Sequence, residues 1–197
     1  LITNWYLKKI ETENLLETID LLRTSSDELL DQVEINYEHS LLINEIAQTL
    51  AKESDIEGLF SKIIRVLHKR LDYDRILVMM TNNERKKLKF QAGFGYDDEQ
   101  VDIIKNISFS LDNPESQGIF TVSFHSKKPM LINNIDDFRE ELSPRSYEFV
   151  RKMKVKSLIC CPIVYENEAL GILAVDNIVS KRPLVARDMN LLMGIAL

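Results

Sequence analysis

The fold is decided by residues 157–177, SLICCPIVYENEALGILAVDN, near the end of the chain. Two apolar runs, Leu158–Val164 and Ala169–Val175, flank the polar triplet 166–168. The triplet is too polar to be buried and short enough for a hairpin loop, so the segment predicts two antiparallel strands. Apolar runs with little alternation are typical of central strands that are covered on both faces. We therefore expect this hairpin inside a sheet that lies between helices.

The first of these strands carries the chain's two cysteines, Cys160 and Cys161. Adjacent side chains of a strand point to opposite faces, and a bond between them would need a strained turn. We expect both thiols to be reduced, to serve as small core residues and to belong to an intracellular protein.

Upstream of the hairpin, hydrophobic periodicity and turn residues predict short helices and strands in alternation. Ser54 and Glu57 form a capping box for one helix, and Ser143-Pro144 starts another. The expected helices lie at 55–71, 97–105, 116–126, from 143 and from about 184, and the expected strands at 75–81, 88–95, 107–111 and 129–133. Together with the hairpin this is an α+β domain with about five or six strands.

The front of the chain predicts one long helix, because residues 15–50 contain no Pro and no Gly. Ser26, Asn36 and Ser40 interrupt a stripe of apolar residues at four-three spacing, namely Leu15, Ile19, Leu22, Leu29, Val33, Ile43, Ala47 and Leu50. Such a heptad stripe favours a two-stranded coiled coil, so we expect a parallel homodimer. The alternative is an amphipathic helix that folds back on its own domain. We place the helical segment at 1–40 and the globular domain at 41–197.

Charge is concentrated in the front segment. Residues 1–40 contain three basic and nine acidic residues, whereas the rest of the chain is balanced, and the whole chain has a net charge of −6. A neutral globular part with scattered Lys and Arg has no basic patch for nucleic acid, so we expect no nucleic-acid partner.

The sequence favours a cytoplasmic location. It contains no run of roughly 18 apolar residues and no signal-peptide pattern. Trp5 and Tyr6 before Lys8-Lys9 could be the inner edge of a preceding membrane span or could pack on a partner helix, so membrane contact is expected only if such a span exists upstream. The chain begins without Met and ends within a predicted helix, and we expect it to be part of a longer polypeptide.

The order of elements from about residue 40 resembles the GAF domain family. The local sequences IEGLFSKIIRVLHKRLDYDRILVMM (56–80) and KKPMLINNID (127–136) resemble its opening helix and first strand and its mid-domain strand and loop. The resemblance implies an α+β GAF fold, with a central antiparallel sheet, helices on both faces and a preceding coiled-coil-like helix. It also implies a sensory domain of a larger signal-transduction protein. Such a domain is not itself an enzyme, and binding of a small molecule is relayed through dimer helices to an effector such as a kinase, cyclase or transcription activator.

Cyclic-nucleotide-binding members of this family carry an Asn-Lys pair after the final strand, then a Phe and an Asp-Glu pair. The matching positions here are Asp176-Asn177, Leu184 and Asp188-Met189, so only Asp188 is kept. Cyclic-nucleotide binding is therefore a minor alternative. Asp176 is expected instead to hold a loop by accepting hydrogen bonds from backbone amides.

Other relatives bind haem through a His, attach a bilin to a mid-domain Cys or reduce methionine sulfoxide with several cysteines. His125 lies at the end of a predicted helix, where a His more often interacts with the helix dipole, so haem is a minor alternative. Cys160 and Cys161 lie on the penultimate expected strand and supply no thiol that faces another. We expect no cofactor, no metal site and no catalytic residue.

A ligand is expected on the sheet face opposite the dimer helices, beneath the segments between residues 94 and 153. Apolar walls with a few polar groups are typical of such pockets. The candidate wall residues are Phe90, Phe109, Phe120, Phe124 and Tyr147, and the candidate polar residues are Ser108, Ser110, Asn133 and Asp136. The alternative is that the aromatic residues only fill a core and the domain is a ligand-free dimerisation and relay module.

Overall fold

The computed structural model describes the backbone of residues 2–52, 56–113 and 116–196, and their side chains apart from those of 2–13, 49–52 and 56–57. The chain divides into two compact units, Leu1–Asn44 and Glu45–Leu197. The predicted Ser54–Glu57 capping box and the side chains of Trp5 and Tyr6 lie outside the described residues. None of the described helices combines the length and the apolar composition that crossing a membrane requires.

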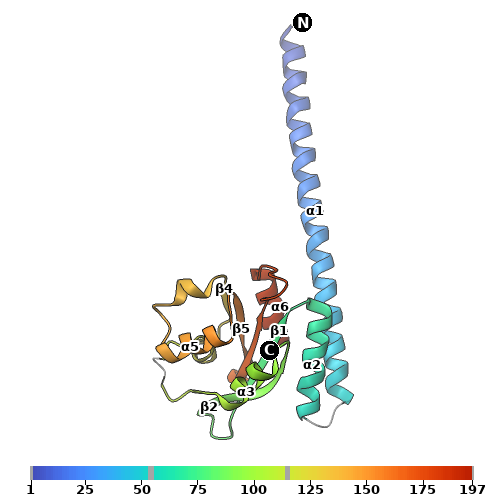
Figure 1. Cartoon of the computed structure of the whole chain (residues 1–197). Coiled ribbons are helices and arrows are strands. Elements are labelled where there is room, and N and C mark those ends of the chain that lie inside the picture. Colours follow the sequence, from blue (N-terminus) through green and yellow to red (C-terminus); the bar gives the residue numbers. More distant parts are fainter. Residues whose placement is uncertain (1, 53–55, 114–115, 197) are drawn as a thin grey trace. The chain divides into compact units, whose positions relative to one another are not determined.

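The helices and strands follow the predicted order, which Figure 1 traces along the chain. They are α1 (Ile2–Lys52), α2 (Ile56–Leu71), β1 (Arg75–Thr81), β2 (Lys87–Phe94), α3 (Asp98–Asn106), β3 (Ser108–Ser110), α4 (Ile119–Ser126), β4 (Met130–Ile132), η1 (Ile135–Phe138), α5 (Pro144–Lys152), β5 (Leu158–Tyr165), β6 (Glu168–Asp176) and α6 (Ala186–Ala196). The α+β class is confirmed, and the 3₁₀ helix η1 is an element that the sequence pattern did not predict.

The six strands form one antiparallel sheet in the order β3-β2-β1-β6-β5-β4. The predicted hairpin joins β5 to β6 through a turn at Glu166 and Asn167, whose φ angles are 47° and 65°. Tyr165 pairs with Glu168, so Glu168 belongs to β6 and the loop contains two residues. Positive φ at both turn positions matches the right-handed twist of the strands that the turn connects.

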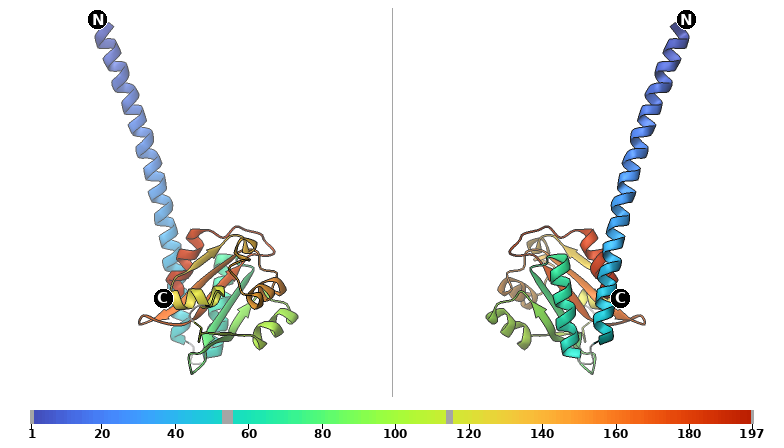
Figure 2. Two further views of the ribbon diagram at one scale, coloured as in Figure 1. Left: turned by 90° about the vertical axis from the view of Figure 1, so that its left-hand side faces the viewer. Right: turned by 90° about the vertical axis from the view of Figure 1, so that its right-hand side faces the viewer.

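Helices cover both faces of the sheet. One view of Figure 2 shows α2 in front of the strands, and the opposite view shows α3, α4 and α5. Cys160 packs in the core beneath α4, where Ser123 Oγ donates to its carbonyl oxygen, whereas Cys161 faces α6 and lies 3.8 Å from the carbonyl oxygen of Met189. The two free cysteines therefore point to opposite faces, as predicted.

Gly171 explains why β6 can pass so close to β1. A Cβ at this position would lie 2.4 Å from the carbonyl oxygen of Met79 and 2.6 Å from Met80 Sδ. A side chain would therefore push the two central strands apart, so glycine is required by the close backbone approach.

In the first unit, the described residues form the predicted helix with its apolar stripe uncovered. The five apolar seam residues at its start are 52% to 65% exposed, namely Leu15, Ile19, Leu22, Leu29 and Val33. In the heptad register of this stripe, the acidic residues between 14 and 44 all fall on the opposite side of the helix, namely Glu17, Asp20, Asp27, Glu28, Asp31, Glu34 and Glu38. The helix therefore has one apolar, acid-free face and one acidic face.

Candidate functional site

A small cavity lies between the sheet and α4 and α5, and its volume is about 40 Å³. Strand residues Leu77, Leu158 and Ala174 contribute to its walls. The other lining residues are Tyr96, Phe109, Gly118, Ile119, Phe120, Leu142, Ser146, Phe149, Val150, Met153, Val155 and Asp176. The cavity is therefore mostly apolar and has polar groups at a few points of its wall.

Three aromatic rings restrict the size of this cavity. The ring centroid of Phe109 lies 5.1 Å from that of Phe120 and 5.3 Å from that of Phe149, and both pairs of rings meet edge to face. Phe120 and Phe149 are 6.4 Å apart in the same geometry. These are favourable aromatic contacts, and they leave room for roughly one to three water molecules.

A larger polar cleft lies next to the cavity and has a volume of about 360 Å³. Phe109, Gly118 and Ser146 line both spaces, so they form the boundary between them. The remaining lining residues of the cleft are Ser108, Ser110, Asn113, Ser116, Gln117, Thr121, Ser143 and Arg145. We call this space the hydroxyl cleft, because Ser and Thr make up most of its lining.

The hydroxyl cleft is built by β3 and the first turns of α4 and α5. Ser143 is the N-cap of α5, where its Oγ accepts from the backbone N–H of Ser146 at 3.2 Å and donates to Ser146 Oγ at 2.9 Å. Arg145 reaches across to β3, where a guanidinium nitrogen lies 3.4 Å from the carbonyl oxygen of Ser108. The start of α5 is thereby held against β3.

A buried ion pair closes one side of the apolar cavity. Arg75 donates to both carboxylate oxygens of Asp176 at 2.7 and 2.6 Å and to the carbonyl oxygen of Met153 at 2.7 Å. The two side chains are 1% and 3% exposed. The guanidinium carbon lies 4.9 Å from the ring centroid of Tyr96. Asp176 thus contributes a cavity wall whose charge is already neutralised by Arg75.

Burial dominates the protonation behaviour of this cluster. It raises the pKa of the Asp176 carboxyl above its ordinary value, and the hydrogen bonds and charge of Arg75 oppose that rise. Burial also raises the pKa of the Tyr96 phenol, with a further contribution from the Asp176 charge. Tyr96 therefore stays protonated well into the alkaline range.

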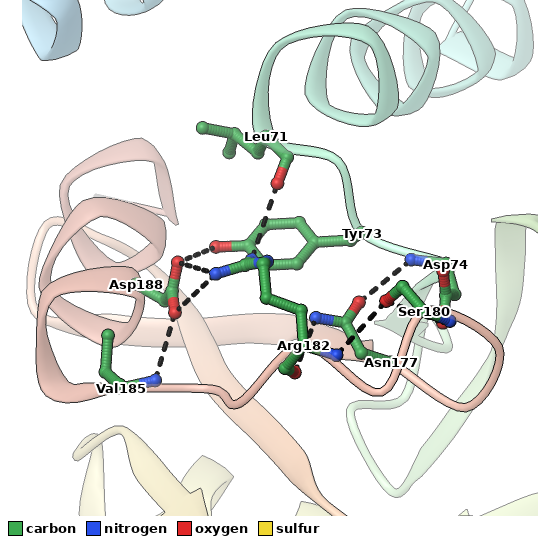
Figure 3. A network of polar contacts seen from close by, with 8 residues as sticks. All are labelled: Leu71, Tyr73, Asp74, Asn177, Ser180, Arg182, Val185 and Asp188. Carbon is green, nitrogen blue, oxygen red and sulfur yellow. Dashed lines mark hydrogen bonds and ion pairs between the residues drawn. The ribbon is translucent and has the colours of Figure 1, made fainter.

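The predicted role of Asp176 is wrong, because this carboxylate pairs with Arg75. Asp74 holds the loop after β6 instead (Figure 3). Its carboxylate accepts from the backbone N–H groups of Val179 at 2.6 Å and Ser180 at 2.8 Å. The backbone N–H of Asp74 in turn donates to Asn177 Oδ1 at 3.0 Å.

A second Arg–Asp pair fixes the start of α6. Arg182 donates to both carboxylate oxygens of Asp188 at 3.2 Å, and its guanidinium carbon lies 5.2 Å from the ring centroid of Tyr73. Asp188 also accepts from the Tyr73 hydroxyl at 3.2 Å and from the backbone N–H of Val185 at 3.0 Å. Asn177 Nδ2 donates to the Arg182 carbonyl oxygen at 3.2 Å. Asn177 and Asp188, which stand at two of the positions that correspond to the cyclic-nucleotide motif, therefore serve this loop network.

The structure brings four of the predicted ligand residues together. Phe109 and Phe120 line the apolar cavity, and Ser108, Ser110 and Phe109 line the hydroxyl cleft. Phe149 also lines the cavity, although it was not among the residues predicted from the sequence. The sequence signal that could have identified Phe149 is the apolar group that it forms with Val150 and Met153 at the end of α5, all of which are buried.

The other five predicted residues line neither of these two spaces. Phe90 borders a separate cleft of about 520 Å³ beside β2 and α3, and Phe124 packs against the core. Tyr147 lies beneath Arg139, whose guanidinium carbon is 5.4 Å from its ring centroid. Asn133 and Asp136 are exposed before and within η1.

The cysteines and histidines of the described residues form neither a reactive thiol site nor a metal site. Burial raises the pKa of Cys161 to about 12 and raises the pKa of Cys160 further above its ordinary value. Neither cysteine lines the cavity or the hydroxyl cleft. His125 is exposed near the end of α4, and the described residues contain no cluster of three His, Cys, Asp or Glu side chains suited to a metal ion.

One protein family profile, described as GAF domain, matches residues 55–197. No curated protein sequence matches the chain. Among solved structures, a methyl-accepting chemotaxis protein (residues 122 to 287) is 28% identical with a TM-score of 0.64, over 77% of this chain and 90% of that chain.

Two structures with lower identity share the fold. The GAF domain of a phosphoenolpyruvate-protein phosphotransferase from Coxiella burnetii is 12% identical with a TM-score of 0.64, over 82% of this chain and 89% of that chain. The free methionine-R-sulfoxide reductase from Neisseria meningitidis, in complex with its substrate, is 12% identical with a TM-score of 0.61, over 80% of this chain and 83% of that chain. The fold is therefore found both in signalling proteins and in an enzyme.

Proposed function

Because this chain belongs to the GAF domain family, we propose that it is a sensory domain that binds a small molecule and relays its binding to an effector. The observation that carries this proposal is the apolar cavity with the adjoining hydroxyl cleft, on the sheet face covered by α4 and α5. Apolar walls with a few convergent polar groups are the usual composition of a small-molecule site.

A continuous set of contacts supports the relay from this site to α6. Asp176 lines the cavity at the end of β6, and Asn177 follows it and binds the loop. The same loop carries Arg182, which pairs with Asp188 in the first turn of α6 (Figure 3). A ligand that displaces the Asp176 wall would change the loop and the start of α6 through packed groups rather than across solvent.

The output is proposed to pass through a parallel homodimer of α1. The five apolar seam residues between 15 and 33 are more than half exposed in the single helix, and all acidic residues between 14 and 44 lie away from the seam. A second copy would cover the seam without bringing acidic side chains against each other. Ser26, Asn36 and Ser40 interrupt the seam, and such a helix pair can keep two packings of similar free energy.

We propose no enzymatic activity for this domain, in contrast to the methionine sulfoxide reductase that shares the fold. Both thiols are buried, have raised pKa values and lie away from the cavity. A thiol needs its thiolate form to act as a nucleophile, and these two are held in the neutral form. The cytoplasmic location expected from the sequence remains a prediction.

The test of the dimer uses single cysteines in a background with Cys160→Ala and Cys161→Ala. Leu29→Cys in a parallel dimer places the two thiols across the seam, and oxidation should give a covalent dimer. Asp31→Cys, on the acidic face, is the matched control and should stay monomeric on a denaturing gel. A small-molecule panel is then applied, and a compound that raises the Tm should change the cross-linking rate of Leu29→Cys. If no compound that binds alters this rate, the relay is refuted.

A ligand-free dimerisation and relay module is the second candidate, and one observation favours it. The rings of Phe109, Phe120 and Phe149 reduce the apolar cavity to about 40 Å³. Phe149→Ala distinguishes the two candidates. If the rings only fill a core, the substitution should lower stability by about 3 to 5 kcal/mol and leave the seam cross-linking rate unchanged.

A further inference from the structure

The hydroxyl cleft has the chemistry of an anion site. It is lined by the Arg145 side chain and by six Ser and Thr residues, and none of its described lining residues is acidic. These lining hydroxyls include Ser108, Ser116, Thr121 and Ser146. A cation with several hydroxyl donors beside it favours a negatively charged group.

Two helix N-termini meet at the same cleft. α4 begins after Gly118, which supplies no side-chain cap, and α5 begins after Ser143. Neither helix has an acidic residue in its first turn. Both positive helix ends therefore lack the acidic side chain that often accompanies them, and they can stabilise an anion from outside the chain.

Thr121 points to a ligand independently of the helix ends. It is 2% exposed and lines the cleft, and its hydroxyl has no hydrogen-bond partner among the described residues. This hydroxyl faces the cleft and can therefore donate a hydrogen bond to a group that enters it. Its Oγ1 would lie 3.6 Å from a Cβ built on Gly118, as would Ser116 Oγ, and Ser146 Oγ would lie 3.3 Å away. Three hydroxyl groups thus surround the space that a side chain at Gly118 would occupy.

We infer that this cleft binds the carboxylate of a small organic acid whose short apolar chain enters the adjoining cavity. The inference rests on the proposed sensory function and names the ligand class of that site. The carboxylate lies beside Gly118, Thr121 and Ser146 and near Arg145. The apolar part of the ligand passes Phe109, which lines both spaces, and points toward Phe120 and Phe149. The absence of a side chain at Gly118 leaves the space for the carboxylate.

The size of the apolar cavity limits the length of the ligand's apolar chain. A volume of about 40 Å³ corresponds to roughly one to three water molecules, so only the end of a short apolar chain enters the cavity and the rest of the ligand lies in the cleft. Short or branched chains fit this space, whereas a linear chain of about eight carbon atoms does not. A phosphate group without a chain would leave the cavity unused.

Isothermal titration of the 197-residue chain with isovalerate tests the inference. Isovaleramide is the neutral isostere, octanoate is the long-chain acid, and inorganic phosphate is the anion without a chain. Isovalerate should bind at least ten-fold more tightly than any of these three. Equal affinity for isovaleramide overturns the carboxylate assignment but leaves a small-molecule sensor. Tighter binding of phosphate overturns the role of the cavity.

Variants test the position of the carboxylate. Gly118→Ala and Thr121→Val should each weaken isovalerate binding at least ten-fold, and Arg145→Gln should weaken it several-fold. Arg151→Gln removes the same charge from α5 outside the cleft and should bind as the wild type does. Circular dichroism checks that each variant is folded, and Ser110→Ala at the outer rim provides a milder change in the same cleft. If isovalerate affinity is unchanged in Gly118→Ala and Arg145→Gln, the site is elsewhere and the inference is wrong, whatever the outcome of the seam cross-linking.

Discussion

Two clusters in the second unit are built from the same three residue types and differ in burial. In each, an arginine pairs with an aspartate through two hydrogen bonds and lies over a tyrosine ring, at 4.9 Å for Arg75 and Tyr96 and at 5.2 Å for Arg182 and Tyr73. The Arg75–Asp176 side chains are 1% and 3% exposed, and those of Arg182–Asp188 are 35% and 14% exposed. The first pair therefore lies in the core, whereas the second is partly exposed and fixes a loop.

The largest effect is expected from breaking the buried pair. Asp176→Ala leaves the Arg75 guanidinium in the core, where the Met153 carbonyl oxygen is its one remaining acceptor among the described residues. An uncompensated buried charge costs about 3 to 5 kcal/mol, so the free energy of unfolding should fall by this amount in chemical denaturation. Removing both charges with Arg75→Met and Asp176→Leu should restore most of the loss, since the double variant leaves no charge unpaired. A double variant as unstable as Asp176→Ala would show that the pair itself stabilises the fold.

A smaller effect is expected at the loop cluster. Asp188→Ala removes the acceptor for Arg182, for the Tyr73 hydroxyl and for the backbone N–H of Val185 before α6. Loss of a helix cap costs about 1 kcal/mol, and water can solvate the half-exposed arginine. We expect a loss of about 1 to 2 kcal/mol in the same denaturation experiment, with Asp188→Asn intermediate. A loss equal to that of Asp176→Ala would contradict the role given to burial.

The sequence predicted the elements of the fold better than the contacts within the site. The apolar runs at 158–164 and 169–175 predicted β5 and β6, because local composition suffices to identify buried strands. The role of Asp176 depended on its partner across the sheet, and Arg75 lies opposite it in the register of β1 and β6. Register between distant strands is set by the whole sheet, so the sequence did not distinguish Asp176 from Asp74.

The candidate site shows the same limit. Alternation along β3 predicted that Phe109 and the two serines beside it, Ser108 and Ser110, point to opposite faces. Phe109 lines the apolar cavity and the two serines do not. Asn133 and Asp136 were chosen for their polarity, but the chain turns into η1 at that point and leaves them exposed. Phe149 reaches the cavity because α5 packs over the sheet, which is a tertiary arrangement that no local pattern contains.

The tyrosine of each cluster provides a further test, in which stability is measured as a function of pH. At pH 7, Tyr73→Phe should lower the free energy of unfolding by about 1 kcal/mol, because the hydroxyl donates to Asp188. Tyr96→Phe should cost less, since no hydrogen bond of its hydroxyl is found among the described residues. Burial raises the pKa of both phenols above the ordinary value of 10.0, with the charge of a nearby aspartate as a second cause.

The sign of the pH effect follows from these raised pKa values. Above pH 10 the unfolded chain loses the phenol protons while the folded state keeps them, so the wild type should lose stability as pH rises. Each tyrosine contributes at most about 1.4 kcal/mol per pH unit. Each Phe variant should therefore lose less stability than the wild type between pH 10 and 11, as measured by urea denaturation. Tyr165→Phe removes an exposed hydroxyl and serves as the control. If Tyr73→Phe and Tyr96→Phe both lose as much stability between pH 10 and 11 as the wild type does, the raised pKa values of the two phenols are contradicted.

The smallest effect is expected at a third pair, which is more exposed than the other two. Arg85 pairs with Glu168 at the start of β6, and the two side chains are 56% and 59% exposed. Water solvates both charges whether or not they meet, and salt screens their attraction. Arg85→Ala should therefore change the free energy of unfolding by less than about 0.5 kcal/mol, and the change should shrink further in 0.5 M salt. The losses in the free energy of unfolding would then follow the burial of the three pairs, from Arg75–Asp176 through Arg182–Asp188 to Arg85–Glu168. A loss at Arg85 as large as that at Asp188 would show that hairpin geometry, and not burial, decides the value of these pairs.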